Sequence, residues 1–318
     1  MSTPLVILCP GQGAQALGMA RAWVDASAES RAVFDEADRV LGDRLGARLS
    51  TICFEGPADR LNQTDVSQPA IYTASIACWR GMLARKGMTA TDAPLAATLG
   101  LSLGEYTALC VAGALSFADG LELVTLRGRA MQDAATAHPG SMVALIGADE
   151  AQAQTVCDKA AWQTGEPIVC ANFNAPGQIV ISGGKKACEA STAIAGEMGL
   201  RATALVVAGA FHSPLMQPAA DRLGEALAKT KINEPRCPVV ANVTARPHTA
   251  ADGLNFADSV RKRLSEQLTS SVRWSQSCEW AGANIKGEYH ELAPGRTLAG
   301  LMRRIDKLIK VTSNEEPG

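Results

Sequence analysis

A block of alternating strand and helix patterns over residues 137–205 constrains the fold of this chain most strongly. Within it the order is strand, helix, two strands joined by the turn "NAPG" at 174–177, helix and strand. This βαββαβ order is typical of a ferredoxin-like unit. Residues 1–136 and 206–318 instead carry short apolar strands followed by helices, as in α/β proteins. We therefore predict an α/β fold in which a small ferredoxin-like subdomain is inserted into a larger, discontinuous one.

The larger subdomain is expected to contain strands formed by four short segments. These are residues 5–9, 94–100, 237–243 and 288–294. The tail that follows Val311 is expected to be frayed.

Composition excludes several classes of function. The net charge of −2 gives no reason to expect a nucleic-acid partner. No apolar stretch approaches the 18 residues of a membrane span, and the first residues lack the basic region of a secretory signal. The nine cysteines form no C-x-x-C pair, and several lie in apolar runs, as expected in a reducing compartment. We therefore expect a cytoplasmic protein without a metal-ligand cluster.

Ser102 lies between two glycines, in the segment "GLSLG", directly after a strand and before a helical pattern. In such a turn the glycines relieve crowding and lift the serine hydroxyl off the sheet, where it can act as a nucleophile. The helix N-terminus supplies free N–H groups that can bind an oxyanion. The alternative is a glycine-rich connector whose serine only caps the helix. The motif by itself leaves both open.

A nucleophilic serine needs a base, and the chain contains four histidines. His138 and His248 lie beside prolines and are expected in surface loops, whereas His290 lies in a strand pattern. His212 follows a strand and precedes a helical segment, the position where active-site residues of α/β folds collect. We therefore favour His212 as the partner of Ser102.

Arg127 lies in an otherwise apolar helical segment, "TLRGRAM". An arginine can bind a carboxylate with two parallel hydrogen bonds. The alternative interpretation is that Arg127 is a surface residue whose aliphatic stem covers apolar neighbours. By pattern alone Arg129 is an equally good candidate.

Six segments occur in the order seen in the family of malonyl-CoA:acyl carrier protein transacylases, which this chain resembles over nearly its whole length. They are "PGQGAQ" (10–15), "GLSLGEY" (100–106), "LRGRAMQ" (126–132), "NFNAPGQIVISG" (172–183), "GAFHSPLM" (209–216) and "LAPGRTLAGL" (292–301). The resemblance implies a hydrolase-like α/β core with an inserted ferredoxin-like subdomain, as the patterns above also indicate.

The resemblance also implies roles for individual residues. Ser102 would be the nucleophile, His212 its catalytic base, and Arg127 the side chain that binds the free malonyl carboxylate. Phe211, before the histidine, matches the malonyl-selective members. Leu101 departs from the family, which usually has histidine before the nucleophile, and its effect on acyl preference is left open.

Three further roles implied by the resemblance belong to backbone groups. The N–H groups of Gln12 and Leu103 would form the oxyanion hole. The carbonyl of Gln267 would orient His212, so that no aspartate or glutamate is required at that place.

The implied reaction moves a malonyl group from malonyl-CoA to the phosphopantetheine thiol of acyl carrier protein through a malonyl-serine intermediate, for fatty-acid or polyketide synthesis. It needs no metal or cofactor, and the expected protein is a monomer with malonyl-CoA and acyl carrier protein as partners. Three alternatives stay open: a serine thioesterase or acyl hydrolase, an acyltransferase for another extender unit, and a scaffold that binds the carrier without catalysis.

Overall fold

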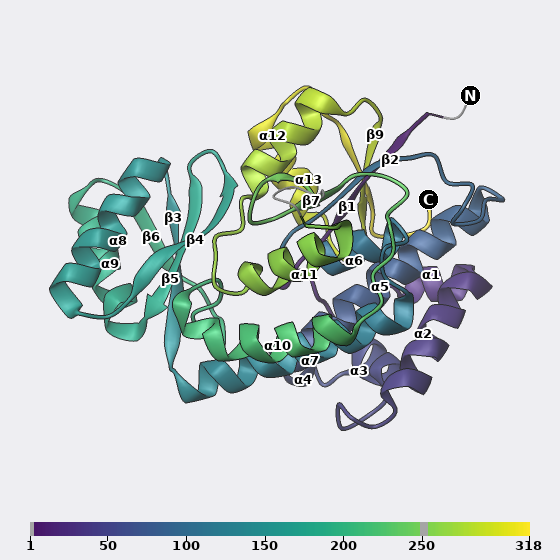
Figure 1. Ribbon diagram of the computed structural model, residues 1–318, viewed down its shortest axis with the longest axis horizontal. Coiled ribbons are helices and arrows are strands. Elements are labelled where there is room, and N and C mark those ends of the chain that lie inside the picture. Colours follow the sequence, from purple (N-terminus) through teal and green to yellow (C-terminus); the bar gives the residue numbers. More distant parts are fainter. Residues whose placement is uncertain (1–2, 249–253) are drawn as a thin grey trace.

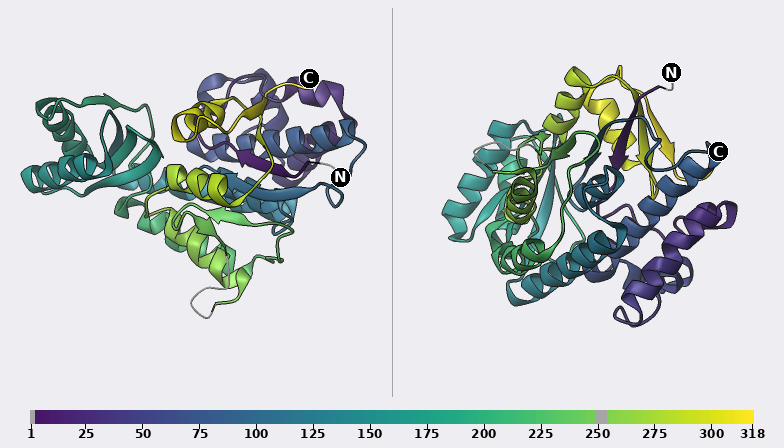
Figure 2. Two further views of the ribbon diagram at one scale, coloured as in Figure 1. Left: turned by 90° about the horizontal axis from the view of Figure 1, so that it is seen from above. Right: turned by 45° about the vertical axis from the view of Figure 1, so that its right-hand side comes forward.

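Two separate β-sheets organise the chain, one in each subdomain (Figure 1). The computed structural model describes residues 3–248 and 254–318. The smaller subdomain projects from one end of the larger one, and the first and last strands of the chain, β1 and β10, both belong to the larger subdomain (Figure 2). The predicted α/β class is confirmed.

The sheet of the large subdomain has six strands in the order β10-β9-β1-β2-β7-β8. All neighbours are parallel except the short pair β7–β8. The strands are β1 (Leu5–Cys9), β2 (Leu95–Gly100), β7 (Val239–Ala241), β8 (Arg246–Pro247), β9 (Glu288–Leu292) and β10 (Val311–Asn314). Every residue of β1 is buried, as expected for a parallel strand covered on both faces.

Helices cover both faces of this sheet. Alternate side chains of β1 belong to different apolar clusters: Ile7 packs on the side of α5 and α6, whereas Val6 and Leu8 pack on the side of α12 and α13. The helices of this subdomain are α1 (Arg21–Ala26), α2 (Ala28–Leu41), α3 (Leu49–Glu55), α4 (Ala58–Leu61), α5 (Thr64–Arg85), α6 (Gly104–Val111), α7 (Phe117–Ala137), α10 (Gln217–Lys229), α11 (Phe256–Gln267), α12 (Trp274–Asn284) and α13 (Thr297–Ile305). None of the helices described is long and apolar enough to cross a membrane.

The small subdomain has the predicted βαββαβ order. Its elements are β3 (Gly140–Ile146), α8 (Glu150–Thr164), β4 (Ile168–Ala175), β5 (Gln178–Gly184), α9 (Lys185–Glu197) and β6 (Arg201–Ala204). The strands form an antiparallel sheet in the order β4-β5-β3-β6, and α8 and α9 enclose a separate apolar core. The sheet lies within the predicted limits, 137–205, and the limits themselves stay a prediction.

Strand β4 joins the two subdomains. Beyond its pairing with β5, Phe173 donates its backbone N–H to Val272 O at 2.9 Å, and Val272 donates to Ala171 O at 2.8 Å. Val272 lies between α11 and α12 of the large subdomain. These bonds hold the small sheet against the large subdomain and thereby define one wall of the cavity described below.

The expectation of a frayed tail after Val311 is wrong. Residues 311–314 form β10, which pairs in parallel with β9 at the edge of the large sheet. Its last residue, Asn314, accepts a hydrogen bond from Nε1 of the buried Trp23 at 2.9 Å. The backbone of β9 and the side chain of Trp23 therefore hold these residues in place.

We predict that truncation after Lys310 destabilises the protein. It removes the ladder of β10 and the acceptor of Trp23, at about 1 kcal/mol for each lost hydrogen bond, so the free energy of unfolding should fall by about 2–4 kcal/mol. Urea denaturation followed by Trp fluorescence measures the change. Truncation after Glu315, which keeps β10, is the control, and equal stability of both truncated chains would show that the strand contributes nothing.

Candidate active site

Ser102 lies on a sharp turn between β2 and α6. Its φ is +52°, a left-handed conformation that non-glycine residues rarely adopt. The glycines on either side make this turn accessible: a Cβ on Gly100 would overlap the backbone of Gly104, and a Cβ on Gly104 would overlap the carbonyl of Cys9. The backbone is therefore held in a strained shape that presents the serine hydroxyl at the carboxyl end of the sheet.

His212 meets Ser102 across 110 positions in the sequence. Its Nε2 lies 2.8 Å from Ser102 Oγ, and its Nδ1 lies 2.7 Å from the backbone oxygen of Gln267. A carbonyl only accepts, so Nδ1 carries the proton and Nε2 is free to accept the proton of the serine. The serine–histidine pair thus has the geometry of a nucleophile and its base.

The electrostatic surroundings keep His212 neutral. Burial, followed by the positive charge of Arg127, lowers the pKa of His212 to about 4, although the hydrogen bond to Gln267 opposes this shift. The imidazole is therefore unprotonated at neutral pH and able to act as a base.

Arg127 is buried, with 1% of its surface exposed, and its guanidinium faces the serine. Nη2 donates to Ser102 Oγ at 3.0 Å and to Gln267 Oε1 at 2.9 Å, and Nη1 donates to Gln68 Oε1 at 2.8 Å. All three acceptors are neutral, and within the described residues no carboxylate forms an ion pair with it. In contrast, Arg129 is 63% exposed at its side chain and pairs with two aspartates. The structure thus separates two arginines that the sequence pattern could not.

The two predicted oxyanion donors belong to segments next to the serine. Leu103 is the residue before α6, and Gln12 lies in the loop that follows β1. This loop packs closely on the serine turn, because Leu101 donates its N–H to Cys9 O at 3.1 Å and a Cβ on Gly11 would overlap Leu101 O. Within residues 3–248 and 254–318, no acceptor is hydrogen-bonded to the N–H of Gln12 or Leu103. Their role as oxyanion donors stays a prediction.

Ser102 lines a cavity of about 970 Å³ that lies between the two subdomains. The large subdomain supplies Leu101, Arg127 and His212 to its lining, and the small one supplies Asn172 and Asn174 from β4. The segment 205–208, which connects the subdomains, lines it as well. A cavity of this size can enclose an acyl group and part of the chain attached to it. No group of three histidine, cysteine or acidic side chains able to hold a metal ion occurs in the described part of the chain.

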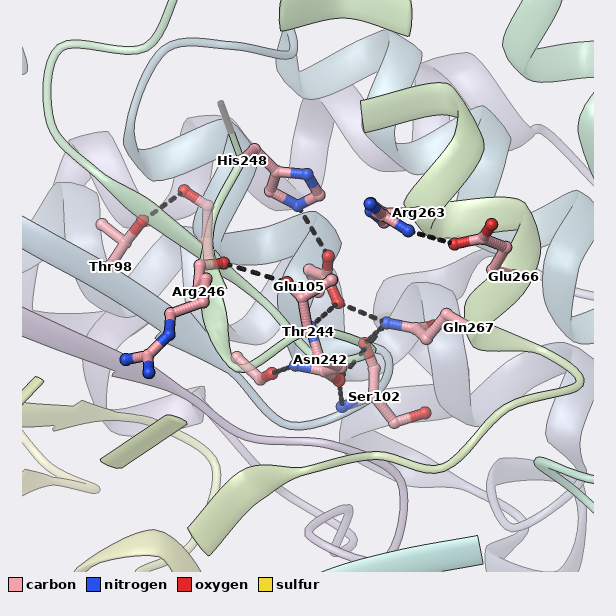
Figure 3. A network of polar contacts seen from close by, with 12 residues as sticks. Thr98, Ser102, Glu105, Asn242, Thr244, Arg246, His248, Arg263, Glu266 and Gln267 are labelled. Atoms are coloured by element: carbon pink, nitrogen blue, oxygen red, sulfur yellow. Dashed lines mark hydrogen bonds and ion pairs between the residues drawn. The ribbon is translucent and has the colours of Figure 1, made fainter. Parts of the chain in front are cut away.

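A network of buried polar side chains next to the serine turn was not predicted from the sequence. The expectation that His248 lies in a surface loop is wrong, because His248 is buried and its Nε2 lies 2.7 Å from Glu105 Oε1 (Figure 3). Asn242 accepts the backbone N–H of Ser102 at 2.7 Å through Oδ1. The sequence held one signal for this network: Glu105 is a charged residue in the otherwise apolar helix that follows the serine, and a buried charge needs partners.

The remaining histidines lie away from the serine. His138 is exposed at the end of α7, in agreement with the expectation. His290 lies on β9, next to Glu288 and Asn314. Of the four histidines, only His212 is hydrogen-bonded to Ser102 in the described structure.

Comparison with known proteins gives a consistent result. The family model of the acyl transferase domain matches residues 6–293. The malonyl CoA-acyl carrier protein transacylase of Escherichia coli K12 is 38% identical over 316 residues, which cover 99% of this chain and 97% of that protein. The crystal structure of malonyl-CoA:acyl carrier protein transacylase from Xanthomonas oryzae superposes with a TM-score of 0.90 at 39% identity, covering 100% of this chain and 96% of that one.

A third similar structure contains a carrier protein. It is a malonyl-transacylase in complex with its type II polyketide synthase acyl-carrier protein, and its TM-score is 0.88 at 35% identity, with 99% of this chain and 97% of that chain covered.

We predict that the reactivity of Ser102 persists to low pH. Because the pKa of His212 is about 4, the base is lost only as the pH falls through that value, and not near the ordinary 6.5. The rate of modification by phenylmethanesulfonyl fluoride, an uncharged reagent, should therefore be flat from pH 7 to about 5. Intact mass measures the rate, and circular dichroism confirms that the protein stays folded. A midpoint near 6.5 would contradict the prediction.

Proposed function

This chain belongs to the acyl transferase domain family, and from this premise we propose that it transfers malonyl groups from malonyl-CoA to the phosphopantetheine thiol of an acyl carrier protein. One observation carries the choice of malonyl: a buried guanidinium, Arg127, lies 3.0 Å from the hydroxyl of Ser102 and has only neutral partners. The carboxylate of a malonyl group bound to this serine would supply the missing negative charge.

In the first half of the reaction Ser102 takes up the malonyl group. His212 Nε2 accepts the hydroxyl proton, and Oγ attacks the thioester carbonyl of malonyl-CoA. The N–H groups of Gln12 and Leu103 are proposed to bind the oxyanion of the tetrahedral intermediate. The C–S bond then breaks, and the thiolate of coenzyme A leaves with the proton that His212 holds.

In the second half the malonyl group leaves the serine. The phosphopantetheine thiol of the carrier protein gives its proton to His212 and attacks the ester carbonyl, and Ser102 Oγ regains the proton as the C–O bond breaks. The same base thus serves both halves of a ping-pong transfer.

The group on Nδ1 of His212 bears on the hydrolase alternative. A serine hydrolase of the triad type would place a carboxylate there, whereas this chain places the backbone oxygen of Gln267 at 2.7 Å. We therefore favour transfer over hydrolysis.

The setting of the enzyme is part of the same proposal. We propose that it supplies fatty-acid or polyketide synthesis, since similar proteins act with acyl carrier proteins by name. All nine cysteines are free thiols, which supports the cytoplasm as its location. The monomeric state expected from the sequence stays a prediction.

We predict that Arg127→Ala abolishes the preference for malonyl over acetyl groups. Truncation of one partner of a buried charge pair costs about 2–5 kcal/mol, which corresponds to a loss of about 30-fold to several thousand-fold in kcat/KM for malonyl-CoA. Acetyl-CoA lacks the carboxylate, so kcat/KM for acetyl-CoA should fall far less. The measurement is kcat/KM for both thioesters.

Arg129→Ala is the matched control for Arg127→Ala, since Arg129 lies two residues away on the same helix but is exposed. It should keep the preference of the unmodified protein. If Arg127→Ala instead lowered kcat/KM for both thioesters by the same factor, the arginine would have a structural role. The choice of malonyl would then lose its support.

A further inference from the structure

Glu105 is a fully buried carboxylate to which the mechanism above gives no part. It lies in the first turn of α6, three residues after Ser102, and Figure 3 shows it at the centre of the polar network. Its Oε1 faces His248 Nε2 at 2.7 Å, and its Oε2 accepts from Gln267 Nε2 at 2.7 Å and from the backbone N–H of Asn242 at 3.0 Å. Carboxylates only accept hydrogen bonds, so such a set of partners suits an anion that the fold retains in its interior.

Gln267 connects this anion to the cation of the site. At one end of its side-chain amide, Oε1 accepts from Arg127 Nη2 at 2.9 Å. At the other end, Nε2 donates to Glu105 and to Ser102 O, the latter at 3.0 Å. Carboxylate, amide and guanidinium therefore form a continuous chain of hydrogen bonds.

Glu105 contributes the shortest of three contacts that set the direction of the amide, since Ser102 O and Asn242 Oδ1 also accept from Nε2, at 3.0 and 3.3 Å. An amide turned the other way would place its NH₂ group against the guanidinium and its oxygen against the carboxylate, so that both contacts would become repulsive. In the observed direction the negative charge polarises the amide and strengthens Oε1 as an acceptor for Arg127. The second acceptor of Arg127, Gln68, bonds its amide nitrogen to the sulfur of Met131 and not to a carboxylate.

Two neighbours hold Glu105 in place. His248 contacts Oε1, and Asn242 contacts Oε2 through its backbone while its side chain bonds both Gly100 O and Ser102 N, each at 2.7 Å. The carboxylate is therefore fixed relative to the serine turn, and so is the amide that it orients.

We propose that Glu105 is a positioning residue for substrate selection, which acts through the Gln267 amide to aim the Arg127 guanidinium at the carboxylate of the acyl group. The inference rests on the proposed function, because it takes that carboxylate as the ligand of Arg127. It differs from a purely structural role in one respect: loss of the Glu105 contacts must weaken malonyl transfer more than acetyl transfer.

The test is Glu105→Asp, which keeps the charge and withdraws the carboxylate by one methylene, out of reach of the Gln267 amide. The ratio of kcat/KM for malonyl-CoA to that for acetyl-CoA should fall about tenfold, the effect of one hydrogen bond to a charged group. In an Arg127→Ala background, Glu105→Asp should leave the ratio unchanged, because two residues that act through one contact are not additive.

Glu266→Asp is the matched control. Glu266 precedes Gln267 in the chain and pairs with Arg263 and Lys262, outside the amide contacts. It should leave the ratio unchanged. If Glu105→Asp fails to fold, Gln267→Met breaks the same chain of hydrogen bonds and keeps the backbone oxygen that bonds His212; it should lower the ratio likewise.

Two results would overturn the inference and leave Glu105 as a structural residue. One is that Glu105→Asp lowers kcat/KM equally for malonyl-CoA and acetyl-CoA. The other is that it lowers the malonyl-to-acetyl ratio just as much in the Arg127→Ala background. Failure of the unmodified protein to transfer malonyl groups to a carrier would instead overturn the proposed function. The two failures are therefore distinguishable.

Discussion

The close crossing of β2 and α6 over the end of β1 is the constraint on which the rest of the site depends. Gly100 and Gly104 approach each other and Cys9 so closely that a side chain at either would overlap the backbone. In this close approach the backbone of Ser102 adopts a left-handed conformation. The strands β1 and β2 are parallel, and Cys9 is paired with Gly100. The loop of Gln12 and the turn of Ser102 therefore both begin at the carboxyl end of the sheet. The nucleophile and its proposed oxyanion donors thus come from adjacent strands.

The other groups reach this turn from distant parts of the chain. Arg127 comes from α7, His212 from the connection that returns from the small subdomain, and Gln267 from the end of α11. Gln267 is common to both, since its backbone oxygen bonds His212 and its side chain bonds Arg127. Base and cation therefore share one partner, while the inserted small subdomain lines one side of the cavity next to them.

The sequence predicts the local parts of this arrangement well. The turn of Ser102 and the βαββαβ order depend on neighbouring residues, and the structure places them as expected. His212 was expected directly after a strand, which is wrong, because β6 ends at Ala204 and an irregular connection carries the histidine to Ser102. The sequence could not choose between Arg127 and Arg129 by pattern, because burial decides between them. Contacts between distant residues were missed for the same reason: His248 follows a proline as a loop residue does, yet a carboxylate 143 positions earlier lies against it. Similarly, β10 depends on contacts with β9 and Trp23, which the local sequence does not reveal.

The most direct test of the account is the intact mass of the protein after incubation with malonyl-CoA, followed by addition of an acyl carrier protein that bears its phosphopantetheine. We expect a malonyl adduct on Ser102 that disappears as the same mass appears on the carrier, and no adduct on Ser102→Ala. Release of free malonate without a carrier, at the rate at which the adduct forms, would identify a hydrolase. Absence of any adduct on the unmodified protein would contradict a covalent transfer altogether.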